Sequence, residues 1–279
     1  MAVRNILVAF NDTVSSEMAL KAALIFQEQF DTHVTGLSTT PAAGLSAQVK
    51  GWLPDGVFTA LQQAEAKRQD DVVDKWSKLS AGAKGHDKVH WLQLSGDATA
   101  NVIEQGRYFD LIFVGQYDRS ASDPHQVLHP DRIALQSGKP VVHIPVAFDP
   151  GPVNDHLVVA WDGKRAAARA LSDALNLLGP AQEITVLTVE EEGSAAPSGV
   201  DTLLCHLERH DIQARHLPVK TKRRSHYNIA EAIMTVCAEQ RPDVLVMGAY
   251  EHSKFREDTF GGVTETILKE AAFPVWMAH

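Results

Sequence analysis

Short apolar segments alternate along this chain with longer segments in which apolar residues recur at the period of a helix. The apolar segments of the first half lie near residues 4–10, 33–39, 88–94, 110–115 and 140–146. Those of the second half lie near 156–161, 182–189, 212–219, 243–248 and 274–278. Short buried strands separated by helices are typical of a parallel sheet with right-handed crossovers and helices on both faces. The pattern therefore predicts an α/β fold.

Helices are expected in the segments between these strands. In the second half they are predicted near 165–178, 199–210, 227–239 and 263–272. The first half contains an irregular excursion at 41–56 and then a long predicted helix near 57–80, which carries Trp76 on its apolar side.

The two halves of the sequence repeat each other. The segment DLIFVGQYDRS at 110–120 returns 133 residues later as DVLVMGAYEHS at 243–253. The first strand repeats as well, with ILVAFN at 6–11 aligned to LVVAWD at 157–162. The match continues into the next helix, where apolar residues have the spacing of one stripe packed against a sheet. A duplicated α/β unit is the direct interpretation.

The repeat predicts two domains, 1–147 and 156–279, joined by a linker at 148–155 that is rich in Pro, Gly and Asp. A chain of 279 residues is long enough for two domains that each close a core. A short linker lets them pack side by side, and their edge strands offer a natural shared surface. Intramolecular pairing of the domains is therefore expected, and a homodimer is left open.

Composition places the chain among soluble globular proteins, since hydrophobic residues make up 44% and charged residues 22%. The formal net charge of −9 argues against a nucleic-acid partner, because phosphate backbones are bound by clustered Lys and Arg. No apolar stretch approaches the roughly 18–20 residues of a membrane span, and the N-terminal run is too short for a signal peptide. Cys205 and Cys237 have no paired spacing, so a cytoplasmic location is expected.

A constellation of glycines follows the fourth strand of the second half. Met247 and Gly248 end that strand, and Gly261-Gly262-Val263-Thr264 opens the next helix. Glycines let backbone N–H groups approach an anion closely, and the free amides of a helix N-terminus carry partial positive charge. The constellation therefore predicts a phosphate cradle. The alternative is that Gly248 only allows a tight turn and that Gly261-Gly262 begin a helix under crowding.

These glycines, with Asp162 after the first strand and Pro274 before the last, resemble the signature of the universal stress protein family. The resemblance covers nearly the whole chain, once per half, so the chain is similar to a tandem, UspA-like universal stress protein. It implies two flavodoxin-like or adenine-nucleotide α-hydrolase-like domains, each with a five-stranded parallel sheet. It also implies frequent dimerisation and an adenine nucleotide at the carboxyl ends of the strands.

The resemblance assigns a cofactor-binding site to the second half. In the family the acid after the first strand lies near the adenine and ribose, and the glycine loop lies near the phosphates. The assigned residues are Asp162, Gly163, Val189, Met247, Gly248, Gly261, Gly262, Val263 and Thr264. The expected ligand is ATP or AMP, with Mg²⁺ only as a companion of the nucleotide and no other metal.

The second half departs from the family pattern at two positions. Glu251 stands where the family has its second glycine, and its carboxylate would repel a phosphate by about 1 to 4 kcal/mol. Gly262 replaces an expected hydroxyl residue, a loss for which Thr264 is the candidate substitute. A weakened nucleotide pocket is therefore predicted.

The first half departs further from the pattern. Asn11 replaces the acid, and Asp118 replaces the second glycine. Residues 127–130 (VLHP) align with 261–264 (GGVT) of the second half but include no glycine. Pro130 also has no N–H to donate to a phosphate. The first half is therefore expected not to bind a triphosphate and to have a structural role.

Two other clusters are candidate sites. His206 and His210 lie four residues apart on a predicted helix and, with His216 nearby, suggest a metal site, but a solvated helix face is the favoured interpretation. The basic run 220–224 (KTKRR) is interpreted as an exposed loop, with phosphate recognition as the alternative.

The sequence favours a stress-response protein that acts as a binding or signalling module. One alternative is an interaction protein that binds no nucleotide and pairs through its sheet edges. The other is a slow nucleotide hydrolase in which Asp162 and Thr264 position a water molecule. No established catalytic motif is present, so an enzyme is the less favoured interpretation.

Overall fold

The computed structural model describes residues 3–40, 55–117, 127–148, 156–178, 183–191, 199–221, 226–250 and 262–279. Residues up to 148 are called the first half below, and residues from 156 the second half. Nearly all of the irregular segment predicted at 41–56 and of the linker predicted at 148–155 lies outside the described residues.

The apolar pattern correctly predicted the strands, with bounds that differ by at most three residues. The first half contains β1 (Asn5–Ala9), α1 (Val14–Phe30), β2 (His33–Thr40), α3 (Asp55–Ser80), a 3₁₀ turn (His86–Lys88), β3 (Val89–Ser95), α4 (Ala98–Gly106), β4 (Leu111–Gly115), α5 (Pro130–Gln136) and β5 (Val141–Ile144). The second half contains β6 (His156–Ala160), α6 (Arg165–Leu178), β7 (Glu183–Glu191), α7 (Val200–Glu208), β8 (Arg215–Thr221), α8 (His226–Gln240), β9 (Val244–Gly248), α9 (Val263–Glu270) and β10 (Val275–Ala278).

The largest difference lies at the start of β8, and it has a local cause. Helix α7 ends at Glu208, and Asp211 then adopts a left-handed backbone with a φ of 60°. The amide of Ile212 donates a hydrogen bond to the carbonyl of Leu207 at 3.0 Å. The C-terminal capping structure of α7 therefore extends to residue 212. The strand predicted at 212–219 therefore begins only at Arg215.

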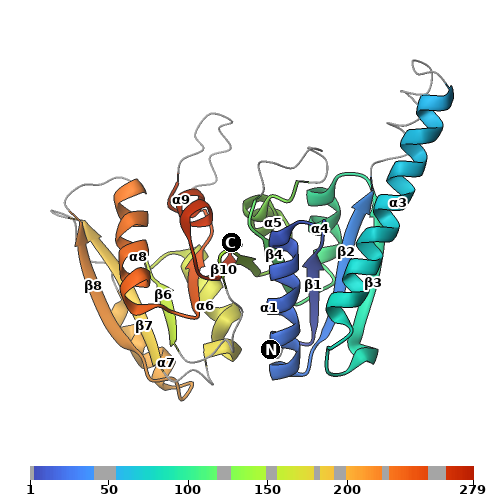
Figure 1. Cartoon of the computed structure of the whole chain (residues 1–279). Helices are drawn as coiled ribbons and strands as arrows, with labels where there is room; N and C mark the ends of the chain where they lie inside the picture. Colours follow the sequence, from blue (N-terminus) through green and yellow to red (C-terminus); the bar gives the residue numbers. More distant parts are fainter. Residues whose placement is uncertain are drawn as a thin grey trace.

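Within the described residues, ten strands form one sheet in the order β3-β2-β1-β4-β5-β10-β9-β6-β7-β8 (Figure 1). Neighbouring strands are parallel throughout each half. The junction between the halves is the antiparallel pair β5–β10. The predicted α/β fold and the predicted shared surface between edge strands are both confirmed.

The two strands that pair at the junction, β5 and β10, are equivalent strands of the sequence repeat. Residues 140–144 (PVVHI) align with 274–278 (PVWMA), so Val142 and Trp276 are equivalent positions. In the β5–β10 ladder these two residues lie opposite each other. A strand that pairs with its own equivalent is what a two-fold axis produces in a dimer. The single chain therefore forms a pseudo-two-fold pair of its two halves.

Helices cover both faces of the sheet, because alternate strand residues point to opposite sides. On one face, Ile6 and Val8 of β1 belong to the same buried cluster as Leu20 of α1. On the other face, Leu7 of β1 lies in a second buried cluster with Val102 of α4. The sheet is thus the middle layer between two apolar cores.

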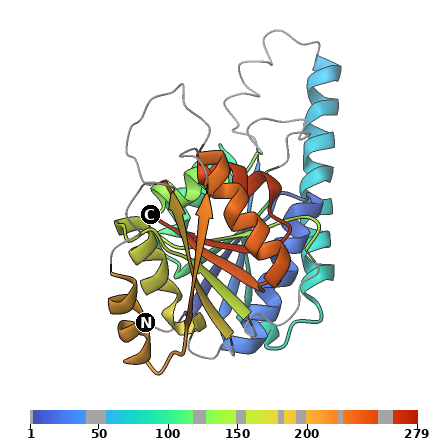
Figure 2. The ribbon, with the colours of Figure 1, turned by 90° about the vertical axis from the view of Figure 1, so that its left-hand side faces the viewer.

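Helix α3 packs on the first of these faces through Trp76, as predicted. The Trp76 side chain is buried, and its ring lies 5.5 Å from that of Phe10 and 5.2 Å from that of Trp91, centre to centre. A Cβ on Gly36 would lie 2.5 Å from the Trp76 ring, so glycine is needed where the indole crosses β2. The other end of α3 extends beyond the carboxyl ends of the strands (Figures 1 and 2).

Candidate functional site

The candidate site lies where the strand order of the second half changes direction. The chain runs from β6 outward to β7 and β8, and then returns to place β9 on the other side of β6. In open parallel sheets, ligands bind at the carboxyl ends of the strands that flank such a switch point. The ends of β6 and β9 and the start of α9 therefore define the site, and Gly261 and Glu251 lie outside the described residues.

Asp162 and Gly163 form the turn that follows β6. Gly163 has a φ of 77°, a left-handed conformation that glycine adopts at low cost. One carboxylate oxygen of Asp162 accepts a hydrogen bond from the amide of Lys164 at 3.0 Å, and the residue is exposed. The predicted acid therefore stands at the edge of the sheet with its carboxylate open to solvent.

Gly248 is held in place by close packing. A Cβ at this position would lie 2.5 Å from the backbone nitrogen of Ala167 and 2.7 Å from the carbonyl carbon of Ala166, at the start of α6. Gly248 has no left-handed φ; that conformation occurs two residues later, at Tyr250, with a φ of 50°. The alternative that Gly248 only allows a tight turn is therefore wrong, because glycine is required by the approach of α6 to β9.

The first half repeats this packing. A Cβ on Gly115 would lie 2.4 Å from the carbonyl carbon of Ser15 in α1, and Ser15 aligns with Ala166 in the repeat. Both repeated glycines therefore let a helix approach the end of a strand. Gly115 and Gly248 are thus explained by the scaffold before any ligand is considered.

Gly262 has the opposite surroundings. It is the N-cap of α9, with an ordinary extended backbone (φ −104°, ψ 171°) and no side chain capping the helix. A Cβ placed on it would meet no atom of the described residues within 4 Å. The described surroundings of Gly262 therefore give no steric reason for a glycine at this helix start. Open space among the described residues thus lies next to the first amides of α9, which have no partner within the helix.

Thr264 is not open to a ligand. Its side chain is buried, and its hydroxyl oxygen accepts a hydrogen bond from the amide of Tyr250 at 3.4 Å. The hydroxyl thus ties the chain after β9 to the first turn of α9. Val263 and Val189 are half-buried, whereas Met247 points into the core beneath the edge.

Arg165 and His279 are two residues at this edge that the sequence reasoning missed. The ring nitrogen Nδ1 of His279 donates to the carbonyl of Ala249 at 2.7 Å, and Arg165 donates to its Nε2 at 3.1 Å. A cation in the first turn of a helix interacts unfavourably with the helix dipole. The position of Arg165 at the start of a predicted helix could therefore have indicated a functional role. Its guanidinium places positive charge beside the end of β9.

The equivalent corner of the first half is occupied by ionic contacts from α3. Asp12, which aligns with Gly163, keeps a left-handed φ of 63°. The Lys75 ammonium lies 2.8 Å from the Asp12 carboxylate and 2.6 Å from that of Glu17. Hydrogen bonds to Asp12 and then to Glu17 raise the pKa of Lys75 above its usual value. In the first half this corner therefore contains a cluster of ion pairs, whereas the equivalent corner of the second half is open at Asp162.

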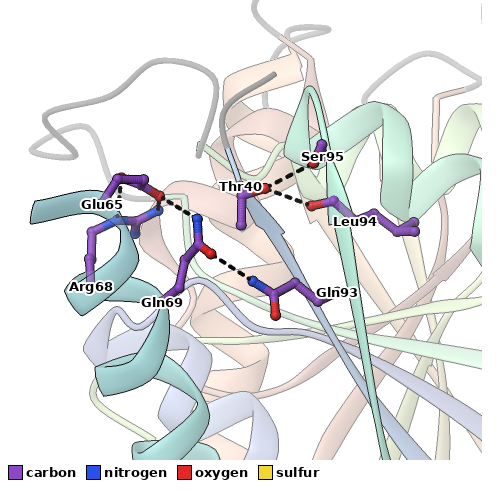
Figure 3. Close-up of polar contacts among 7 residues, drawn as sticks. All are labelled: Thr40, Glu65, Arg68, Gln69, Gln93, Leu94 and Ser95. Carbon is purple, nitrogen blue, oxygen red and sulfur yellow. Dashed lines mark hydrogen bonds and ion pairs between the residues drawn. The ribbon is translucent and has the colours of Figure 1, made fainter. Parts of the chain in front are cut away.

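Polar side chains of the first half also bond to one another further along this edge (Figure 3). The Thr40 hydroxyl donates to the carbonyl of Leu94 at 3.3 Å and lies 3.1 Å from the Ser95 hydroxyl. Gln93 donates to Gln69 of α3 at 3.4 Å. At the start of α5, Val127 and Leu128 pack into the core instead of leaving an open glycine. The two halves therefore present different chemistry at equivalent edges.

Other candidate positions do not join the site. The rings of His206 and His210 lie 4.7 Å apart, and the described part of the chain contains no group of three or more His, Cys, Asp or Glu arranged for a metal. Of the basic run, residues 222–224 lie outside the described residues. No described helix is long and apolar enough to cross a membrane. A groove of about 360 Å³ between α4 and α5 includes none of the predicted site residues.

Comparison with known proteins gives a family match for the second half. Residues 154–279 match the model of the Universal stress protein family. No curated protein matches the chain in sequence.

Solved structures match the whole chain in fold. A universal stress protein from Archaeoglobus fulgidus DSM 4304 aligns with 100% of this chain and 99% of its own, with a TM-score of 0.75 and 15% identity. The functionally unknown protein PA1789 from Pseudomonas aeruginosa PAO1 covers 99% of this chain and 92% of its own, with a TM-score of 0.58 and 16% identity. A universal stress protein in complex with cAMP covers 46% of this chain and 98% of its own, with a TM-score of 0.36 and 18% identity. The first two likenesses extend the shared fold to the first half.

Proposed function

We propose that this chain is a cytoplasmic stress-response protein that acts as a binding or signalling module, because residues 154–279 match the model of the Universal stress protein family. Its ligand is an adenine nucleotide, ATP or AMP, held in a weakened pocket of the second half. Asp162 and Gly163 contact the nucleoside side, and Gly248, Gly262 and the start of α9 face the phosphates. Mg²⁺ enters only with the nucleotide.

The observation that carries this proposal is the open space at Gly262. Packing explains Gly248, but none of the described residues that surround the N-cap of α9 requires glycine there. Open space in front of the first-turn amides of α9 lets an anion approach them closely, and such amides are a ready site for a phosphate. The guanidinium of Arg165, beside the end of β9, adds positive charge for phosphate recognition.

A matched pair of substitutions at this position tests the proposal. Gly262→Ser and Gly262→Asp both supply a good N-cap, so neither is expected to lower the melting temperature. The serine hydroxyl adds a donor for a phosphate oxygen and is expected to tighten ATP binding about tenfold. The aspartate carboxylate is expected to weaken it by about tenfold or more, through repulsion. Calorimetric titration with ATP and AMP measures both effects.

Two results would oppose the proposal. One is that the parent protein and Gly262→Ser show no adenine nucleotide by mass spectrometry after denaturation and no thermal shift with millimolar ATP or AMP. The other is that the serine and aspartate variants change affinity in the same direction, since the phosphates then do not face the N-cap of α9. Gly82→Ser, at another uncrowded glycine in the first half, controls for effects on folding.

An interaction protein without a nucleotide is the second candidate function. It is favoured by the packing role of Gly115 and Gly248 and by the use of the Thr264 hydroxyl within the protein. This second function would be supported if the parent protein binds no ATP and the variant Glu251→Gly does. For a slow hydrolase, Thr264 is poorly placed to orient water because its hydroxyl is buried.

A further inference from the structure

The phenol of Tyr250 reaches across the junction between the two halves. Its hydroxyl donates a hydrogen bond to Oδ2 of Asp131, in the first turn of α5, at 3.3 Å. Burial, followed by the nearby carboxylates of Asp131 and Glu265, raises the pKa of Tyr250 above its usual value. The phenol therefore keeps its proton and remains a donor at physiological pH. One side chain of the second half is thus anchored to the first.

The backbone at Tyr250 leads directly out of the candidate site. Its φ of 50° is unusual for a residue with a bulky side chain and has to be maintained by surrounding contacts. The Tyr250 amide donates to the hydroxyl of Thr264 in α9, and the amide of the preceding residue, Ala249, donates to the carbonyl of Ala278 in β10. The phenol adds a contact that comes from outside the second half.

The equivalent tyrosine of the first half is packed differently. Tyr117 aligns with Tyr250, and its ring lies 5.0 Å from the ring of His129, within the same half. It remains 40% exposed, whereas Tyr250 is half-buried. The tyrosine that bonds to Asp131 therefore belongs to the same half as Gly262. Tyr117 also supplies a matched control for loss of a phenol.

We propose that Asp131 is a positioning residue of the second half's site, supplied by the first half. By holding the Tyr250 phenol, Asp131 fixes the backbone between Gly248 and the segment that leads to α9. The nucleotide affinity of the second half then depends on a residue of the half that lacks the site. This inference rests on the proposed function for its ligand, and on the Asp131–Tyr250 contact for its mechanism.

The test combines nucleotide binding with a measurement that needs no nucleotide. In the full chain, Asp131→Ala and Tyr250→Phe are each expected to weaken ATP binding about fivefold, and the double variant no further, since both remove one contact. Both are expected to speed hydrogen exchange of the Tyr250 amide by a similar factor, measured by NMR without ligand. Asp131→Asn keeps an acceptor oxygen and is expected to restore both values, and Tyr117→Phe to change neither.

Each outcome decides the inference. If Asp131→Ala and Asp131→Asn both tighten ATP binding, the carboxylate acts only by its charge and the positioning role is overturned. If the Tyr250 amide exchanges at the parental rate in Tyr250→Phe, the phenol does not hold the backbone and the inference fails. If the parent binds no ATP or AMP while exchange responds as expected, the proposed nucleotide function fails but the anchoring contact stands.

Discussion

Replacing Gly248 by alanine is expected to lower the free energy of unfolding by about 2 kcal/mol, although only one methyl group is added. The methyl carbon would lie 2.5 Å from the backbone nitrogen of Ala167. A flexible side chain can turn aside, but here the obstacle is the backbone at the start of α6. Relief therefore requires moving the whole helix away from β9 and opening the core beneath it.

Urea denaturation followed by circular dichroism measures this effect, with two comparison variants. Gly115→Ala is expected to cost about as much, because its methyl group would meet the backbone of Ser15 at 2.4 Å. Gly82→Ala, where a Cβ would meet no atom of the described residues within 4 Å, is expected to change stability by less than about 0.5 kcal/mol. If Gly248→Ala is as stable as the parent but loses ATP binding, the glycine serves the ligand and the packing explanation is wrong.

The sequence was sufficient to predict the scaffold because the scaffold depends on local periodicity and on repetition. Apolar runs such as 110–115 and 243–248 end in glycine in both halves, and that repetition predicted equivalent strands. It did not give the reason for the glycines, because the obstructing atoms of Ala166 and Ala167 lie about 80 positions away from Gly248 in the chain. Steric requirements of this kind become visible only when the helix is placed against the sheet.

The contacts that distinguish the two halves are also long-range in sequence. Lys75 is one charged residue among many on α3, and nothing in its neighbourhood predicts that it reaches Asp12 and Glu17. Likewise, the partner of Tyr250 is Asp131, which the sequence places in the other half. The sequence correctly indicated that the halves differ at the strand ends. Only the structure shows that Lys75 fills the corner of the first half and that Tyr250 spans the junction between the halves.

The second large effect is expected at acid pH, where His143 should destabilise the junction between the halves. His143 is fully buried on β5, and neither ring nitrogen has a hydrogen-bond partner among the described residues. Its neighbours in the ladders are Val114 of β4 and Val275 of β10. Burial in these apolar surroundings lowers the pKa of His143 from 6.5 to about 4. The folded protein therefore holds this imidazole in its neutral form.

The sign of the pH effect follows from the protons bound in each state. Between pH 6.5 and about 4, the unfolded chain binds a proton at His143 and the folded chain does not. Protonation therefore favours unfolding, and stability is lost as the pH falls through this window. A lowering of the pKa of this size corresponds to a loss on the order of 3 kcal/mol at pH 4.

His143→Met isolates this contribution from the other groups that titrate in acid. Methionine is the residue at the equivalent position of the second half, Met277, which is also fully buried, so the strand can accommodate it. Urea denaturation between pH 7 and pH 4 is expected to show a shallower loss of stability in the variant than in the parent, by about 3 kcal/mol at the acid end. Parallel curves for the two proteins would mean that the imidazole finds a partner or solvent in the folded state. A shallower curve for the variant would place an acid-sensitive group in the strand pair that joins the two halves.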